Sequence, residues 1–315
     1  IINDCFEIDS SFDKKHIPFL LDISSKKLAN IFLSGYCFDE KKQIFQLPIP
    51  NLIFTRDIAA VIGKMVLITW GFNKVRNREN ILTKHIFKNH MEFQNIKIFD
   101  FHKNYPDLNI EGGDILILDS NTVLIGISER TSRQAIDAIS PEIFNQGFTQ
   151  IIAIDIPKSR SSMHLDTVLT KIDHNDIIIY PPLFESNNNS DIKYFIIDKN
   201  KSIYDISPKP YQISDIISGK TNFIKCGSDK IINQKREQWT DGANAFAIAP
   251  GVAVGYEHNT YTINELKSNG YTVYSSSEID SSFKLKPKTF ISFPGYELSR
   301  GRGGARCLTL PLYRK

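Results

Sequence analysis

The residues with the clearest chemical potential lie near the end of the chain, where Cys307 follows a run of arginines and glycines. The run reads Arg-Gly-Arg-Gly-Gly-Ala-Arg-Cys from position 300. Glycines let a backbone turn tightly and come close to a ligand. Positive charge beside a thiol lowers its pKa, and the resulting thiolate is the better nucleophile. The segment therefore indicates a nucleophilic cysteine, although an isolated cysteine is just as often an inert residue of the core.

Polar residues collect in four further clusters, at the joints between the expected strands and helices, where scaffolds usually hold their functional groups. The clusters are 51–57, 111–114, 128–132 and 163–167. Taken singly, each has an ordinary explanation, such as a turn, a strand entry or a helix cap. His164 and Asp166 are two positions apart on an expected strand and would share a face. Alone, that pair could be solvated or could be half of a metal site.

Taken together, the clusters supply the groups needed to bind a cation and attack it with a thiolate. Asp57, Glu111 and Asp166 offer carboxylates, His164 can carry a proton, and Cys307 can act as nucleophile. Several carboxylates around one nucleophile suit a cationic substrate that forms paired hydrogen bonds, and a guanidinium is the best such partner. A bound cation would also favour the thiolate form of the cysteine.

Three arginines do not fit beside a guanidinium. Arg76, Arg130 and Arg302 would instead suit a carboxylate at the other end of the same molecule. An amino acid with a guanidinium side chain has both ends, so the sequence points to this class of substrate.

The elements that must position these residues repeat along the chain. Up to Gln43 apolar residues such as Phe12, Phe19 and Ile31 fall at helical spacing, and beyond Leu47 strands and helices alternate. The expected strands are 61–70, 96–101, 115–118, 123–127, 151–156, 166–170, 177–180, 192–197, 245–249, 252–256 and 271–274. The expected helices are 77–90, 132–144 and 263–268, and the expected loops are 186–190 and 208–210.

The repeating unit is therefore two strands, a helix and a strand. A unit of this size cannot cover its own apolar face, so copies must pack against one another. Radial packing around an axis and one long open sheet both satisfy this requirement.

Composition excludes several classes of function. The chain has 315 residues, 41% of them hydrophobic, and a net charge of only +3. It has no basic arm and no apolar run that could cross a bilayer, so we expect neither nucleic acid nor a membrane as partner. The four cysteines are far apart and form no CxxC pair, which favours a reducing compartment over a zinc site or disulfides. The first residue, Ile1, leads us to expect a processed or truncated product.

Seven motifs in family order resemble those of arginine deiminase, a family of guanidine-modifying enzymes with the pentein propeller fold. Together they cover nearly everything from Pro48 to Leu312. They are NLIFTRD from Asn51, VRNREN from Val75, EGGD from Glu111, GISERTS from Gly126, MHLDTV from Met163, REQWTDGANAFAIAPG from Arg236 and ELSRGRGGARCLTLPL from Glu297.

The resemblance implies an α/β fold, a propeller of ββαβ repeats around a pseudo-symmetry axis. It also implies that the first module is missing here, so that residues 1–45 are the end of a helical insertion domain and residues 46–315 the catalytic propeller domain.

The resemblance further implies the role of each site residue. The catalytic residues would be Cys307 as nucleophile, His164 and Glu111 as acid/base residues, and Asp57 and Asp166 as the grip on the guanidinium. The substrate-binding residues would be Arg76 and Arg130 on the carboxylate, Asn51 and Phe54 in the lining of its pocket, and Arg302 as a mobile arginine near the nucleophile.

The implied reaction is hydrolysis of L-arginine to L-citrulline and ammonia through a covalent thiouronium on Cys307, with no metal and no organic cofactor. The expected location is cytoplasmic, and a homo-oligomer is possible. The alternatives are an agmatine deiminase, an amidinotransferase, a truncated arginine-binding form without activity and, more distantly, a thiol protease. Carboxylate-binding arginines favour free arginine over agmatine, and the surplus of carboxylates disfavours the oxyanions of proteolysis.

Overall fold

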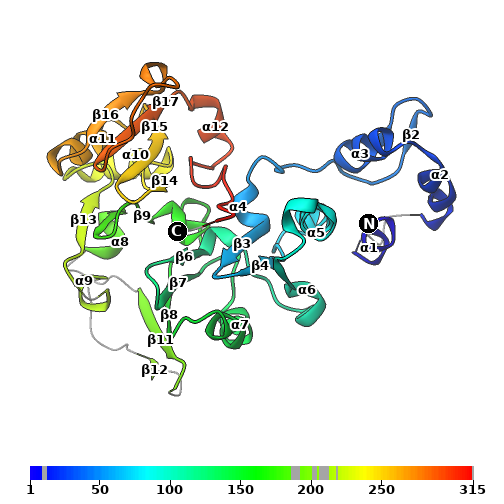
Figure 1. Cartoon of the computed structure of the whole chain (residues 1–315), viewed down its shortest axis with the longest axis horizontal. Helices are drawn as coiled ribbons and strands as arrows, with labels where there is room; N and C mark the ends of the chain where they lie inside the picture. Colours follow the sequence, from blue (N-terminus) through cyan, green and yellow to red (C-terminus); the bar gives the residue numbers. More distant parts are fainter. Residues whose placement is uncertain (9–12, 186–191, 201–203, 206–212, 218, 314–315) are drawn as a thin grey trace.

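The computed structural model describes residues 1–8, 13–185, 192–200, 204–205, 213–217 and 219–313, and its fold is α/β (Figure 1). The expected loops at 186–190 and 208–210 lie outside the described residues, as does Phe12. Across the described helices, none is long and apolar enough to cross a membrane.

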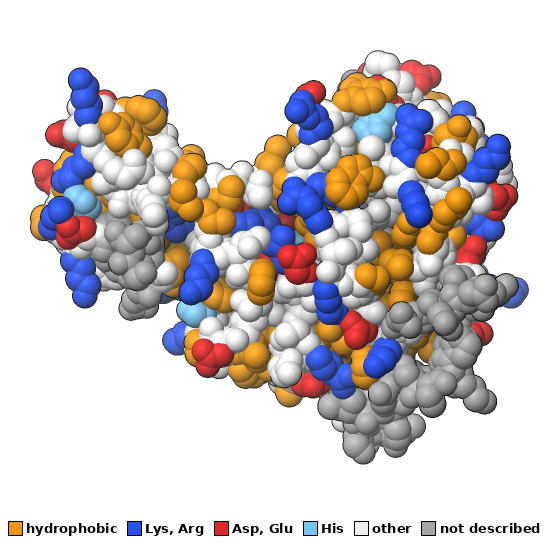
Figure 2. Space-filling model, turned by 180° about the vertical axis from the view of Figure 1, so that it is seen from behind, with side chains coloured by type: hydrophobic (Ala, Val, Ile, Leu, Met, Phe, Trp, Pro, Cys, Tyr) orange, Lys and Arg blue, Asp and Glu red, His pale blue; other side chains and the backbone are white. Residues whose placement is uncertain are grey.

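A small helical lobe precedes the sheets and stands apart from the main body, with a recess between the two (Figure 2). Its elements are α1 (Ile2–Ile8), α2 (Ile17–Asp22), α3 (Ser25–Ser34) and the hairpin of β1 (Tyr36–Cys37) with β2 (Lys42–Gln43). The prediction of helix as far as Gln43 is wrong beyond Ser34. Gly35 ends α3 in the left-handed conformation, with φ +76°, and the chain then forms the hairpin.

The first ββαβ unit consists of β3 (Ala59–Ile62), β4 (Met65–Ile68), α5 (Asn77–Asn89) and β5 (Lys97–Asp100). Strand β4 pairs antiparallel with β3 and parallel with β5. The expected single strand 61–70 is therefore a hairpin, which turns at Gly63, where φ is +58°. The helix expected at 77–90 is confirmed within a residue.

The second unit has the same order and carries the best-predicted elements. They are β6 (Ile115–Ile117), β7 (Thr122–Ile127), α7 (Arg133–Asn145) and β8 (Gln150–Asp155). Helix α7 begins where the Ser132 side chain accepts a hydrogen bond from the backbone N–H of Ala135. Two further strands, β11 (Lys193–Asp198) and β12 (Tyr204–Asp205), extend this sheet beyond β8.

The third unit differs from the prediction in the segment that carries His164 and Asp166. Its strands are β9 (Leu169–Lys171), β10 (Asp176–Ile179) and β13 (Asn222–Lys225), with α8 (Pro181–Phe184), α9 (Ile213–Ile216) and α10 (Ile231–Trp239) nearby in sequence. The strand expected from 166 begins only at Leu169, because Leu165–Thr167 forms a short 3-10 turn, η6. The expectation that His164 and Asp166 lie on one strand face is therefore wrong.

The fourth unit consists of β14 (Phe246–Ala249), β15 (Val252–Tyr256), α11 (Thr260–Ser268) and β16 (Thr272–Ser275), with β17 (Thr289–Phe293) inserted between β15 and β16. Strand β17 runs parallel to both neighbours. It was not predicted, because Thr289 and Ser292 interrupt its short apolar run. Helix α12 (Tyr296–Arg300) follows it.

The units pack in series. One core joins the first two sheets through residues such as Leu67 and Ile125, the next joins the second and third through Leu124 and Ile177, and another joins the third and fourth. The described strands lie in separate sheets, so the alternative of one long open sheet is wrong. The short helices α4 (Thr55–Ile58) and α6 (Phe101–Asn104) lie at the ends of the first sheet.

Candidate active site

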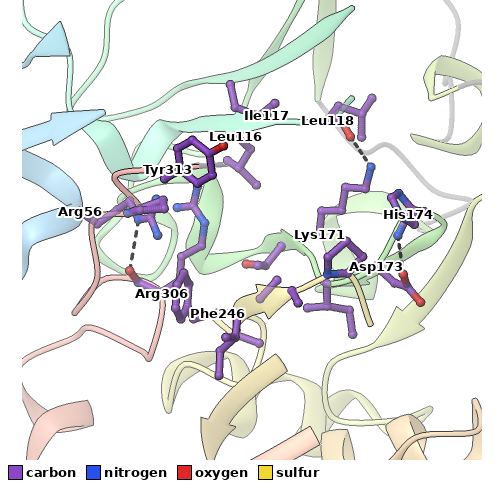
Figure 3. A pocket seen from close by; sticks show the side chains of 18 residues that line it. Arg56, Leu116, Ile117, Leu118, Lys171, Asp173, His174, Phe246, Arg306 and Tyr313 are labelled. Atoms are coloured by element: carbon purple, nitrogen blue, oxygen red, sulfur yellow. Dashed lines mark hydrogen bonds between the residues drawn. The ribbon is translucent and has the colours of Figure 1, made fainter. Parts of the chain in front are cut away.

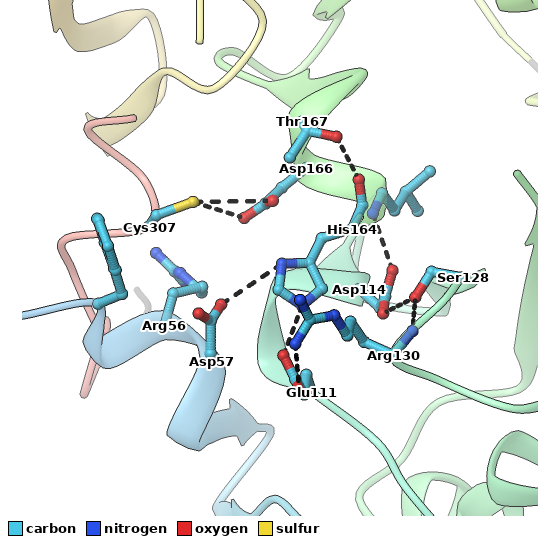
Figure 4. A network of polar contacts seen from close by, with 12 residues as sticks. Arg56, Asp57, Glu111, Asp114, Ser128, Arg130, His164, Asp166, Thr167 and Cys307 are labelled. Atoms are coloured by element: carbon cyan, nitrogen blue, oxygen red, sulfur yellow. Dashed lines mark hydrogen bonds and ion pairs between the residues drawn. The ribbon is translucent and has the colours of Figure 1, made fainter. Parts of the chain in front are cut away.

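Cys307 lies in the loop after α12 and faces Asp166 (Figure 4). Its Sγ atom is 4.0 and 3.9 Å from the two carboxylate oxygens, and both side chains are buried. The backbone N–H of Cys307 donates to Oδ1 of Asn244 over 3.1 Å, while Nδ2 of Asn244 donates to the carbonyl of Asp166 over 2.9 Å. The Asn244 side chain thus links the backbone of Cys307 to the backbone of Asp166, which holds the thiol beside the carboxylate.

His164 stands between two carboxylates. Its Nε2 atom is 2.8 Å from Oε2 of Glu111, and its Nδ1 atom is 3.6 Å from Oδ1 of Asp57 (Figure 4). The tight packing under the ring depends on Gly113, since a Cβ atom there would lie 2.7 Å from the imidazole. The turn before β6 therefore needs glycine at position 113, because any side chain there would displace the His164 ring.

Asp57 projects from α4 and is shared between His164 and Arg76. Nη1 of Arg76 donates to Oδ2 of Asp57 over 2.6 Å, and Nε donates to Glu79 over 2.9 Å. Asn51 joins the same group, because its N–H donates to Glu79 and its carbonyl accepts from Arg76. Arg76 is therefore buried beside the carboxylates in this structure.

Arg130 approaches the pair of His164 and Glu111 from the loop before α7. Its Nη1 atom is 3.8 Å from Oε1 of Glu111, and its Nε atom has no hydrogen-bond partner in the described part of the chain. Phe54 packs against the glycine run before Cys307, where a Cβ on Gly303 would lie 2.1 Å from the Phe54 ring.

Arg302 lies on the other flank of the nucleophile loop. Its guanidinium stacks 4.3 Å from the ring of Trp239, donates to the carbonyls of Trp239 and Ser161, and stands 3.8 Å from Asp241. Arg302 and Asp241 both adopt positive φ, +63° and +64°. Non-glycine residues avoid this region unless their surroundings hold them there, and such residues gather at functional sites.

Burial, together with the charges of Asp166, Asp57 and Asp241, raises the pKa of the Cys307 thiol well above its ordinary value. The expectation that the neighbouring arginines lower this pKa is therefore wrong. Arg306 binds Asp166 instead, with Nη1 2.6 Å from Oδ2, and Arg300 pairs with Glu297 at the surface.

Burial alone would lower the pKa of His164, but Asp57 and the hydrogen bond to Glu111 outweigh it and raise the pKa to about 10. The ring is therefore an imidazolium at neutral pH. Burial would raise the pKa of Asp57, yet the charges of His164 and Arg76 lower it overall. The site thus holds the ionised carboxylate of Asp57 beside one imidazolium, together with a protonated thiol.

Asp57, Glu111 and His164 offer ligand atoms within 4.8 Å of one another, which is a spacing that a metal ion could use. Each imidazole nitrogen faces a different carboxylate, however, so the three side chains bind one another directly. The expectation that no metal is needed stays a prediction.

The sequence assigned no catalytic or substrate-binding role to three buried residues that hold the site together: Asp114, Asn244 and Arg306. All three lie inside the quoted motifs, in EGGD, TDGAN and GGARC, and they are polar residues amid glycine and alanine. That composition is a usable signal, because a polar side chain in a tightly packed turn needs partners.

A cavity of about 530 Å³ lies beyond Arg306 and is lined by the edge strands β6, β9 and β14 (Figure 3). Leu116, Phe246 and Tyr313 contribute to its walls, and Arg306 reaches from it to Asp166. None of the expected catalytic residues lines it. The cavity is therefore separate from the buried cluster formed by Cys307, Asp166, His164, Asp57 and Glu111.

Residues 37–314 match the family model described as "Arginine deiminase". The chain is 38% identical over 283 residues to the arginine deiminase of Listeria monocytogenes serovar 1/2a, covering 88% of this chain and 64% of that protein. It is 31% identical over 328 residues to the arginine deiminase of Mycoplasma capricolum, covering 98% and 74%. The chain therefore spans just under two thirds of the Listeria relative.

The fold is also that of solved structures. The amino-terminal domain of ArgZ, a cyanobacterial arginine dihydrolase bound to product, aligns with a TM-score of 0.58 at 18% identity, over 84% of this chain and 77% of that one. An adduct of dimethylarginine dimethylaminohydrolase with S-methyl-L-thiocitrulline aligns with a TM-score of 0.54 at 15% identity, over 83% and 77%. At such identities the likeness concerns the fold alone.

Proposed function

Because the chain belongs to the arginine deiminase family, we propose that it hydrolyses L-arginine to L-citrulline and ammonia, with Cys307 as nucleophile. One observation carries the proposal: the buried thiol lies within 4.0 Å of Asp166, in a site whose imidazolium is held between Asp57 and Glu111. The two aspartates offer the paired acceptors that a guanidinium prefers.

The reaction begins when the substrate guanidinium binds between Asp57 and Asp166. Its positive charge offsets the carboxylates that raise the pKa of Cys307, so the thiol releases its proton to water. The thiolate attacks the central guanidinium carbon and forms a C–S bond. Fixing both partners in this geometry removes much of the entropic cost of the encounter.

His164 then acts as general acid. The imidazolium gives its proton to one amino group of the tetrahedral adduct, the C–N bond breaks, and ammonia leaves behind a thiouronium on Cys307. The neutral imidazole, oriented by Glu111, takes a proton from a water that attacks the same carbon. Cleavage of the C–S bond releases citrulline and restores the thiol, so one water is consumed for each ammonia formed.

Arg76 and Arg130 are proposed to hold the substrate carboxylate, with Asn51 and Phe54 beside them. Arg130 is the better placed, because its Nε atom has no partner within the described residues. Arg76 would have to share its guanidinium between the ligand and Asp57. Arg302 is proposed as the movable arginine of the nucleophile loop.

We also propose that the four ββαβ units stand around a pseudo-symmetry axis as propeller modules. The edge strands of three units line one cavity, as inner strands of a propeller would. Residues 1–45, with a core around Leu20 and Phe32 that packs on Ile81 of α5, are proposed as a helical domain next to the catalytic domain of residues 46–315. The missing first module, cytoplasmic location and homo-oligomer stay predictions.

The test is citrulline formation from L-arginine by the purified chain, beside a Cys307→Ala control and an agmatine assay. Citrulline that disappears in the control supports the proposal, whereas turnover of agmatine instead would favour an agmatine deiminase. Transfer of the amidino group to an added amine would favour an amidinotransferase. Arginine binding without any product would favour the non-catalytic form.

A further inference from the structure

Asp114 has no role in the reaction steps above, yet it is one of the most completely buried charged residues of the chain. Its Oδ2 atom accepts hydrogen bonds of 2.6 Å from the hydroxyls of both Ser128 and Thr131. Its Oδ1 atom accepts a hydrogen bond of 2.8 Å from the backbone N–H of Leu165. One carboxylate thus joins three motifs that are distant in the sequence (Figure 4).

Each of these bonds leads to a proposed site residue. The Thr131 hydroxyl also accepts from the backbone N–H of Glu111 over 3.1 Å. The Ser128 hydroxyl accepts from the backbone N–H of Arg130 over 2.9 Å. Leu165 directly follows His164, so the bond to its N–H fixes the backbone that carries the imidazole.

An amide could not replace this carboxylate. The Ser128 hydroxyl oxygen already accepts from the N–H groups of Arg130 and Thr131, so both of its lone pairs are used and it can only donate to residue 114. An asparagine has a single acceptor oxygen, and its amino group would face either Ser128 or the N–H of Leu165. At least one buried donor would then lose its partner, which displaces the segment that carries it.

The Asp114 carboxylate is packed closely against Gly126 of strand β7. A Cβ atom on Gly126 would lie 2.4 Å from Oδ1 of Asp114 and 2.8 Å from the Leu165 side chain. Strand β7 therefore needs glycine at this position, so that the carboxylate can reach the backbone of Leu165.

We propose that Asp114 is a positioning residue for the reaction, holding Glu111, Arg130 and His164 in register through Ser128, Thr131 and Leu165. The inference rests on the proposed function, since it assigns those three residues to acid/base work and substrate binding. A displacement of a catalytic group by about 1 Å can cost about 100-fold in rate, so losing these hydrogen bonds should lower activity about 10-fold to 100-fold.

The first experiment compares Asp114→Asn with a matched control, Asp176→Asn. Asp176 is also a buried aspartate with several donors, among them the Tyr271 hydroxyl at 2.7 Å and Asn222 at 3.2 Å, but it lies in β10 and touches no site residue. We expect Asp114→Asn to lower kcat for L-arginine about 10-fold to 100-fold, and also to raise KM, because Arg130 loses its register with the rest of the site. Asp176→Asn should lower the unfolding midpoint and leave kcat unchanged. Equal effects on kcat would overturn the proposal.

A second pair of variants decides the question if Asp114→Asn does not fold. Thr131→Val removes the hydroxyl between Asp114 and the backbone of Glu111 without changing any charge, and Thr131→Ser retains it. We expect kcat to fall about 10-fold in the valine variant and to recover in the serine variant. A valine variant with unchanged kcat contradicts the positioning role.

A readout that needs no turnover separates this proposal from the proposed function. The titration of the His164 ring, followed by NMR, reports its distance from the carboxylates of Asp57, Glu111 and Asp114. Thr131→Val should lower the pKa of His164 relative to wild type, and Thr131→Ser should restore it. If the wild type forms no citrulline, the proposed function fails, while an unmoved titration in Thr131→Val overturns the role of Asp114.

Discussion

Replacing Asp166 by asparagine should make Cys307 more reactive and the enzyme less active. The carboxylate lies 3.9 to 4.0 Å from Sγ, and its charge is among the causes that raise the pKa of the thiol. At about 4 Å and an effective dielectric constant near 20, two like charges repel by about 4 kcal/mol. Since each 1.36 kcal/mol is a factor of ten, the thiolate population should rise by up to about 10³.

Part of this gain is lost, because a less basic thiolate is a weaker nucleophile. With a Brønsted coefficient of about 0.4 to 0.5, roughly half of the logarithmic gain remains, so the net rate should rise about 30-fold. Arg306 acts in the same direction, since the substitution removes its partner and leaves its positive charge beside the thiol. The citrulline rate should fall at least about 100-fold, because the guanidinium loses one of its two carboxylates.

The assay follows release of the chromophore from a small neutral aromatic disulfide at pH 7.5, with mass spectrometry to identify the modified cysteine. Cys307→Ala sets the background from Cys5, Cys37 and Cys226, which are buried and form no disulfide bond. Asp176→Asn controls for a general loosening of the fold. An Asp166→Asn variant whose Cys307 reacts no faster than wild type refutes the reasoning, whatever its citrulline rate.

Three further predictions follow from the same geometry. Gly113→Ala places a Cβ atom 2.7 Å from the buried His164 ring, so kcat should fall about 100-fold and the free energy of unfolding should fall by about 1–3 kcal/mol; an unchanged kcat would show that the ring position is not critical. Arg130→Leu should raise KM for L-arginine about 100-fold and leave agmatine turnover unaffected, and equal losses for both substrates would contradict the carboxylate contact. Although burial lowers the pKa of His164, Asp57 and Glu111 raise it to about 10, above the ordinary 6.5. The imidazolium therefore stabilises the fold fully below pH 6.5, and this contribution disappears as pH rises through 10. The difference in unfolding free energy between wild type and His164→Gln should accordingly shrink between pH 6 and pH 10, and a constant difference would exclude an imidazolium.

The fold was predictable where the spacing of apolar residues agreed with the turn and capping residues at the ends of an element. The hairpin of β6 and β7 and the helix α7 carry clear patterns, with a capping serine at 132, and all three were predicted. Strand β17 and helix α10 were not predicted, because Thr289 and Ser292 interrupt the apolar run of the strand and the helix has few apolar residues. The 3-10 turn at Leu165–Thr167 was also not predicted, since a single short turn leaves no periodic pattern in the sequence.

The sequence predicted which residues form the site, but not which of them pair with one another. Residue types alone pointed to a thiol, an imidazole and several carboxylates, and the structure brings Cys307 to Asp166 and His164 to Glu111. No spacing rule could show that Arg306 turns to Asp166 rather than to the neighbouring thiol. That choice depends on which oppositely charged atom the fold brings within reach, and burial then makes the pairing obligatory.

This pairing decides the order of events in the proposed reaction. The imidazolium of His164 already carries its proton at neutral pH, so it cannot take one from Cys307. Burial and the surrounding carboxylates keep the thiol protonated as well. In the proposed reaction the substrate guanidinium lies between Asp57 and Asp166 and brings a positive charge that can reverse this balance. Activation of the nucleophile is thus coupled to recognition of the cation, and a neutral molecule such as citrulline would bind without recreating the thiolate. The carboxylates that make Cys307 unreactive by itself are therefore the same groups that make it selective.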